Sequence, residues 1–184
     1  GGVFSRASKR IKLPKQAREL LGIAEKEIEP DALISAILRA PVDLMWFGGI
    51  GTYVKAPHES HMQVGDPAND GLRVDAGELR AKAIGEGANL GVTQAGRIAF
   101  SLNGGRINTD FIDNSAGVDC SDNEVNIKIA LAGAKRAGRL SEKARVALLT
   151  AMTDEVSEIV LEDNRLQALA LSIAETGGAS AAGS

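Results

Sequence analysis

Three short segments of the sequence combine the residue types that hold a flat, uncharged ligand. They are Gly48-Gly49-Ile50-Gly51, Glu86-Gly87-Ala88-Asn89 and Asn114-Ser115-Ala116-Gly117. Glycine lets a ligand approach the backbone closely, and an asparagine side chain offers both a hydrogen-bond donor and an acceptor. The segments therefore indicate a site that orients a ribose or an amide-bearing ring without adding charge to it.

Each segment also has a plainer structural explanation. Residues 48–51 open no clear helix and do not have the G-x-G-x-x-G spacing of a dinucleotide fingerprint, so a tight turn explains them too. Asn89 could simply occupy a turn. Asn114 and Ser121 could serve as helix caps, although the Ser121 hydroxyl, near the start of the predicted helix, could also reach a substrate carboxylate.

Predicted strands and helices explain how the three segments could come together. The predicted strands cover residues 42–47, 82–85 and 106–112, and each leads into one segment. The predicted helices cover residues 14–21, 30–40, 94–102 and 118–134, a long stretch after Ser141, and 164–174. This alternation predicts parallel α/β units, and in an open parallel sheet ligands bind at the carboxyl ends of the strands.

Apolar spacing predicts which helix faces point towards the core. The expected inward residues are Ala95, Ile98, Ala99 and Leu102 in one helix, Val125, Ile129 and Ala132 in the next, and Leu148, Leu149, Met152, Val156, Ile159 and Val160 in the last. Because aromatic residues make up 3% of the chain, such aliphatic stripes must build most of the core.

Composition argues against several classes of partner. The net charge is −3 and the basic residues are dispersed, whereas nucleic-acid binding needs a concentrated basic surface. No apolar run reaches the about 20 residues of a membrane helix. The lone Cys120 fits a reducing cytoplasm, and we expect it to be a small buried residue rather than a nucleophile. His58 and His61 offer too few ligands for zinc.

The stretch at residues 104–122, GGRINTDFIDNSAGVDCSD, closely resembles the large bacterial NAD-dependent glutamate dehydrogenases. Residues 42–55 and 83–93 resemble the same family, and the likeness extends over about residues 1–175. Smaller glutamate dehydrogenases have similar loops at the positions of residues 86–89 and 114–118, although Ser115-Ala116 replaces their Ala-Gly. The resemblance, with the missing initiator methionine, implies a piece from the C-terminal part of a much longer catalytic region.

The resemblance implies an α/β fold, part of a Rossmann-like parallel-sheet nucleotide-binding domain with a helical C-terminal segment. We expect a partial NAD-binding domain at residues 1–134, helices at 135–175 and a flexible tail at 176–184. The implied cofactor-binding residues are Gly48, Gly49, Glu86, Gly87, Ala88, Asn89 and Asn114, with Ser121 binding the side-chain carboxylate of glutamate. Within this set, Asn89 and Asn114 would converge on the nicotinamide, and Gly48 and Gly49 would lie by the adenosine ribose.

The same resemblance implies that the chain holds no catalytic residue. The family's phosphate-binding fingerprint and its catalytic lysine and aspartate are expected in the rest of the parent chain. Lys55, Lys82 and Lys128 are not taken as substitutes, because lysines are usually solvated surface groups. We expect a cytoplasmic homo-oligomer acting on L-glutamate and 2-oxoglutarate. The alternatives are a dehydrogenase of another amino acid and a non-catalytic binding or assembly module.

Overall fold

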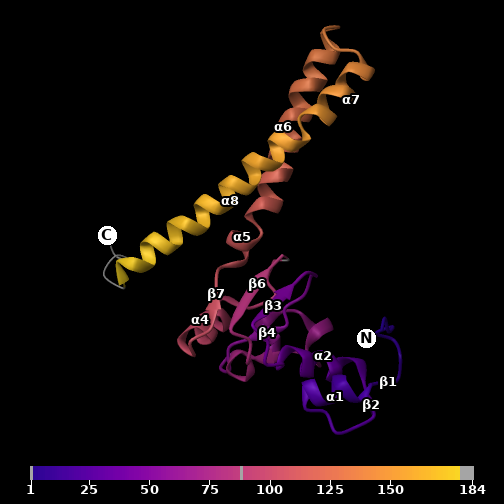
Figure 1. Ribbon diagram of the computed structural model, residues 1–184, viewed down its shortest axis with the longest axis vertical. Coiled ribbons are helices and arrows are strands. Elements are labelled where there is room, and N and C mark those ends of the chain that lie inside the picture. Colours follow the sequence, from indigo (N-terminus) through magenta and orange to yellow (C-terminus); the bar gives the residue numbers. More distant parts are fainter. Residues whose placement is uncertain (1, 88, 179–184) are drawn as a thin grey trace. The chain divides into compact units, whose positions relative to one another are not determined.

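The computed structural model describes residues 2–87 and 89–178. The chain forms two compact units, Gly1–Asp110 and Phe111–Ser184 (Figure 1). Compactness does not decide which residues bind a nucleotide, so the domain limits at residues 134 and 175 stay predictions.

A three-stranded parallel sheet organises the first unit. Its strands are β3 (Leu44–Phe47), β6 (Ala83–Glu86) and β7 (Arg106–Ile107), in the order β3-β6-β7. Residues at the ends of β3 and β6 pair directly, Phe47 with Glu86, so the two strands finish at the same level. The predicted α/β class with parallel strands is confirmed.

The connection from β3 to β6 contains a second, smaller sheet that the sequence pattern did not predict. The elements of this connection are β4 (Val54–Lys55), α3 (His61–Val64), the short 3₁₀ helix η1 (Pro67–Asn69), β5 (Val74–Asp75) and the short 3₁₀ helix η2 (Ala76–Glu78). β4 and β5 pair in parallel, and Val54 also bridges Val92. Strands of two residues are too short to show alternation, which explains why they were missed.

Helix α4 (Gln94–Leu102) connects β6 to β7, and the Thr93 hydroxyl caps it by accepting a hydrogen bond from Gly96 N at 2.9 Å. The predicted inward face of this helix is wrong in part. Ile98 and Leu102 are 54% and 82% exposed, whereas the buried residues include Arg97 and Phe100. The helix is turned about its axis relative to the prediction because Arg97 forms an ion pair with the buried Glu86.

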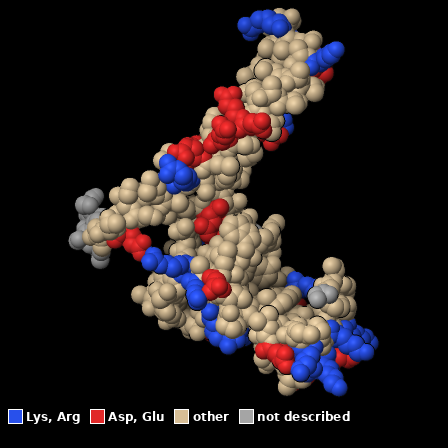
Figure 2. All heavy atoms as spheres, viewed as in Figure 1, with Lys and Arg blue, Asp and Glu red and all other residues tan. Residues whose placement is uncertain are grey.

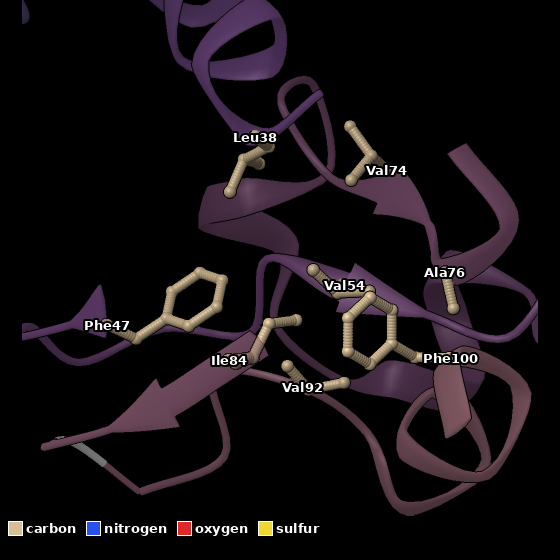
Figure 3. Packing of buried hydrophobic residues seen from close by; sticks show 8 residues of the cluster. All are labelled: Leu38, Phe47, Val54, Val74, Ala76, Ile84, Val92 and Phe100. Carbon is tan, nitrogen blue, oxygen red and sulfur yellow. The ribbon is translucent and has the colours of Figure 1, made fainter. Parts of the chain in front are cut away.

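The core of the first unit lies between the two sheets and the helices (Figure 3). It consists of Leu38, Phe47, Val54, Val74, Ala76, Ile84, Val92 and Phe100. Each of the strands β3, β4, β5 and β6 contributes a side chain, so the same apolar cluster fixes all four. Burial of this apolar surface is the main force that holds the ends of β3 and β6 together.

The N-terminal part confirms two predicted helices, α1 (Lys15–Leu21) and α2 (Pro30–Leu38). Gly22 ends α1 with φ 69°, a left-handed conformation that glycine adopts without steric cost. Pro30 lies in the first turn of α2, where a backbone N–H would have no partner within the helix, so the N–H that proline lacks is not needed there. Strand β1 (Ile11–Lys12) precedes α1 in the chain and β2 (Glu27–Ile28) follows it, and the two strands pair antiparallel.

The second unit is helical. Helix α5 (Asp110–Asp113) begins at the last residue of the first unit and leads into the second. The helices α6 (Ser115–Arg136), α7 (Glu142–Ala151) and α8 (Thr153–Thr176) follow, and α6 packs along α8 (Figure 1). The predicted strand at 106–112 is therefore wrong beyond Ile107, and α6 begins at Ser115 rather than at residue 118. The break between the last helices falls at Met152, not near residue 164.

Several apolar side chains predicted to be buried in this unit are exposed. They are Val125, Ile129, Leu148 and Ile159, whereas Val160 is buried as predicted. Cys120 is also exposed, so its predicted burial is wrong. Figure 2 shows large uncharged areas over these helices. α6 and α8 present more apolar surface than their mutual contact covers, which explains why helical spacing alone misplaced these residues. No described helix is long and apolar enough to cross a membrane.

Candidate functional site

The first two predicted segments lie side by side. Because Phe47 and Glu86 end their strands as register partners, the loops that start at Gly48 and Gly87 leave the sheet together. Gly87 N donates to Phe47 O at 2.9 Å, which extends the pairing one step into the loops. The structure thus brings the start of the 48–51 loop close to Glu86 and Gly87, as expected for the carboxyl edge of a parallel sheet.

The 48–51 loop presents its backbone openly. Gly48 and Gly49 are exposed, and a β-carbon built on Gly49 would meet no atom within 4 Å. Behind the loop, the Tyr53 hydroxyl donates to Ile50 O at 2.8 Å, and the Tyr53 ring stacks on Phe47 with 5.7 Å between centroids. The loop is therefore anchored from one side and accessible from the other.

Glu86 ends β6 with its side chain completely buried. Arg97 donates to Glu86 Oε2 from Nε at 3.0 Å and from Nη2 at 2.7 Å, while Val92 N donates to Oε1 at 3.1 Å. Burial raises the pKa of Glu86, and the hydrogen bonds and charge of Arg97 oppose this increase. The carboxylate thus ties β6 to α4 and to the far end of its own loop.

The loop between Gly87 and Val92 has a second anchor. Asp110 Oδ2 accepts a hydrogen bond from Leu90 N at 2.8 Å, and Asp110 Oδ1 lies 3.4 Å from Arg97 Nη2. Leu90 has φ 61°, alone among the described non-glycine residues in being left-handed. Such a conformation costs a leucine about 1–2 kcal/mol. It persists because its surroundings hold it, which is common at binding sites.

Asn89 lies between these anchors and is exposed. Gly87 on one side is tied to the sheet and Leu90 on the other is tied to Asp110, so the loop is anchored both before and after Asn89. Ala88, also predicted to bind the cofactor, lies outside the described residues. Sequence reasoning missed Arg97 and Asp110 as supports, because an arginine within an apolar helix pattern gives no signal by itself.

The third predicted segment opens α6. Asn114 is the N-cap residue, but its side chain makes no capping hydrogen bond in the part described. Gly117 leaves room for it, since a β-carbon there would lie 2.7 Å from Asn114 Oδ1. Asn164 Nδ2 of α8 donates to Ser115 Oγ at 2.7 Å and to Ile112 O at 3.0 Å, which fixes this helix start.

Two predictions about the site concern Ser121 and the relation between Asn89 and Asn114. Ser121 is exposed in the second turn of α6, so its contact with a substrate stays a prediction. Asn89 belongs to the first unit and Asn114 to the second. The predicted convergence of their amides is a relation between units, and it stays a prediction too.

The three lysines that were set aside differ from one another. Lys82 and Lys128 are exposed, each paired with an acidic side chain. Lys55 is 8% exposed and pairs with Asp75, so the premise that it is solvated was wrong. Among residues 2–87 and 89–178, no group of histidine, cysteine or acidic side chains could hold a metal ion.

Residues 1–174 match the family model described as bacterial NAD-glutamate dehydrogenase, catalytic domain. The NAD-specific glutamate dehydrogenase of Pseudomonas aeruginosa is 55% identical over 175 residues, 95% of this chain. The enzymes with the same name from Mycobacterium tuberculosis and Halomonas elongata are 57% and 53% identical, over 91% and 95% of this chain. The chain spans 11% of the length of each of these relatives. It therefore belongs to the family of bacterial NAD-glutamate dehydrogenase catalytic domains.

Proposed function

We propose that this chain forms the nicotinamide side of the cofactor site in an NAD-dependent glutamate dehydrogenase. The reaction converts L-glutamate, NAD⁺ and water to 2-oxoglutarate, ammonium, NADH and a proton. The observation that carries the proposal is the shared ending of β3 and β6, which sets the exposed glycine loop beside an Asn89 held between two anchors. The names of the relatives support NAD and glutamate as its ligands.

The residues present fit a dinucleotide of this kind. The open backbone at Gly48 and Gly49 suits close approach of the adenosine ribose. Gly87, Ala88 and Asn89 would contact the nicotinamide riboside, and Asn114 the carboxamide. The Glu86 carboxylate is held by Arg97 and Val92, so in this proposal it shapes the loop and adds no free charge beside the ring.

When bound, NAD⁺ supplies the chemistry by accepting a hydride from the substrate. In the proposal the residues of this chain bind and orient: Asn89 and Asn114 fix the ring, and the Ser121 hydroxyl donates to the side-chain carboxylate of glutamate. Proton transfer and carbonyl activation fall to a lysine and an aspartate elsewhere in the parent chain.

A Rossmann-like completion of the sheet, a cytoplasmic location and a homo-oligomer are also proposed. The parallel order β3-β6-β7 supports the first and the single cysteine supports the second. The exposed apolar side chains of α6 and α8 support contacts with the rest of the parent chain and with further subunits.

The test uses a chimeric enzyme, a full-length NAD-specific glutamate dehydrogenase in which this chain replaces the matching segment. Asn89→Ala and Asn114→Ala should each raise the KM for NAD by about 3- to 10-fold, the loss expected for one hydrogen bond. Asn126→Ala is the matched control, because Asn126 is exposed on α6 and donates within its own helix. An unchanged KM for NAD in both site variants would refute the proposal.

A further inference from the structure

Thr52, the residue directly after the glycine loop, is held on both of its backbone groups by side chains from residues 66–73. Asp66 Oδ2 accepts a hydrogen bond from Thr52 N at 2.8 Å. Arg73 Nε donates to Thr52 O, also at 2.8 Å. A backbone unit bound on both sides cannot rotate without breaking a charge-assisted hydrogen bond, and such bonds are stronger than neutral ones.

Arg73 is built into the structure rather than lying on its surface. Its side chain is completely buried, although it carries a full charge. Nη1 donates to Asp70 Oδ1 at 2.6 Å and lies 2.8 Å from His61 Nδ1, while Nη2 donates to Asp66 O at 2.6 Å. Burying a charge is unfavourable unless it is fully paired, and here the fork of donors meets acceptors from several segments at once.

Asn69 extends this arrangement to the glycine loop itself. Its Nδ2 donates to Asp66 Oδ2 at 2.6 Å, which fixes the carboxylate that holds Thr52. The same Nδ2 would lie 2.7 Å from a β-carbon at Gly51, and Gly51 has φ 138°. Gly51 is therefore a glycine for two reasons, its backbone conformation and the close approach of Asn69.

We propose that Asp66, Asn69 and Arg73 are positioning residues that hold the 48–51 loop in its cofactor-binding conformation. We call these three residues the loop clamp. None of them contacts the cofactor in this proposal, and the clamp acts through the backbone of Gly51 and Thr52. The inference rests on the proposed function, since the loop matters in this way where it binds NAD.

The experiment measures separate Michaelis constants in the chimeric enzyme. Arg73→Lys keeps the charge but loses the planar fork, and Asp66→Ala removes the acceptor for Thr52. Each variant should raise the KM for NAD at least about 10-fold, with less than a twofold change in the KM for glutamate at saturating NAD. For Arg73→Ala, added methylguanidinium should restore part of the NAD affinity. Purely structural damage would change both Michaelis constants and kcat together.

Arg80→Lys is the matched control, because Arg80 is exposed and also donates to a backbone carbonyl, Arg39 O at 2.6 Å, away from the loop. If Arg73→Lys and Asp66→Ala behave like Arg80→Lys, or lower all kinetic constants alike, the clamp is wrong. If neither Arg73 variant folds, the result for Asp66→Ala decides, because that side chain is less buried than Arg73.

Gly49→Val separates this inference from the proposed function. It adds a side chain to the open backbone of the loop, at a position where a β-carbon meets no atom within 4 Å. An unchanged KM for NAD in Gly49→Val would refute the role of the loop in cofactor binding. A raised KM in Gly49→Val together with unchanged values in the loop-clamp variants would refute the clamp alone.

Discussion

Arg97 reaches from the buried face of α4 to Glu86 at the end of β6 and gives its carboxylate two hydrogen bonds, at 3.0 and 2.7 Å. Both side chains are almost completely withdrawn from solvent. A buried pair of this kind need not add much stability as a whole, but removing one partner leaves an unpaired buried charge. The pair therefore ties α4 to the end of β6, where the loop that carries Asn89 begins.

The first prediction removes the arginine. Arg97→Met should lower the free energy of local opening around Glu86 by about 3–5 kcal/mol, the usual penalty for breaking a buried ion pair. Hydrogen exchange of the Val92 amide, which donates to Glu86, measures this opening in the chimeric enzyme. Arg165→Met is the control, because its pair with Glu162 is exposed and should change protection little. Equal effects of the two variants would contradict the prediction.

The second prediction concerns pH. Burial raises the pKa of Glu86 above its ordinary value of 4.5, with Arg97 opposing. An acid whose folded pKa is raised binds more protons when folded, so its contribution to stability is greatest below the unfolded pKa. That contribution is lost as the pH rises through the folded pKa.

Glu86→Gln removes this titration. The difference in Tm between the unsubstituted chimera and Glu86→Gln should therefore decrease as the pH is raised from 4.5. A thermal series at constant ionic strength measures it. A difference that grows with pH would mean that Arg97 outweighs burial.

The third prediction tests the left-handed Leu90. Leu90→Gly should relieve strain of about 1–2 kcal/mol, partly offset by the greater freedom of glycine in the unfolded chain. The net result is a Tm equal to or above that of the unsubstituted protein, despite the loss of a leucine side chain. Leu90→Ile, which is β-branched, should lower the Tm. A lower Tm for glycine than for isoleucine would show that φ 61° at this position carries no strain.

The sequence pattern predicted the parts of the fold that local chemistry controls. Proline in the first turn of α2 and the Thr93 hydroxyl at the start of α4 marked those helices correctly. The inward face of α4 could not be predicted, because Arg97 is buried by a partner in a different element. Similarly, the strand expected to run to residue 112 ends early at Ile107, and Asp110 beyond it binds Leu90 N in another loop. Such pairings depend on three-dimensional contacts that periodicity does not record.

The candidate site divides in the same way. Glycine and asparagine types identified the loops at 48–51 and 86–89, and their strand order placed them together. The supports, Arg73 for the first loop and Arg97 for the second, gave no sequence signal, because an arginine is ordinarily exposed. Family resemblance predicted a cofactor role for Asn114, whereas local rules favoured a helix cap that its side chain does not make.

The last prediction uses that start of α6. Gly117→Ala adds a β-carbon 2.7 Å from Asn114 Oδ1, so the asparagine side chain must move. If Asn114 holds the carboxamide of nicotinamide, this variant should raise the KM for NAD several-fold while leaving the helix intact. Gly133→Ala is the control, because Gly133 lies on the same helix and its new β-carbon would meet no atom within 4 Å. It should stabilise α6 by about 1 kcal/mol without affecting NAD. Steady-state kinetics and the Tm of both variants give the comparison, and a normal KM in Gly117→Ala would separate Asn114 from cofactor binding.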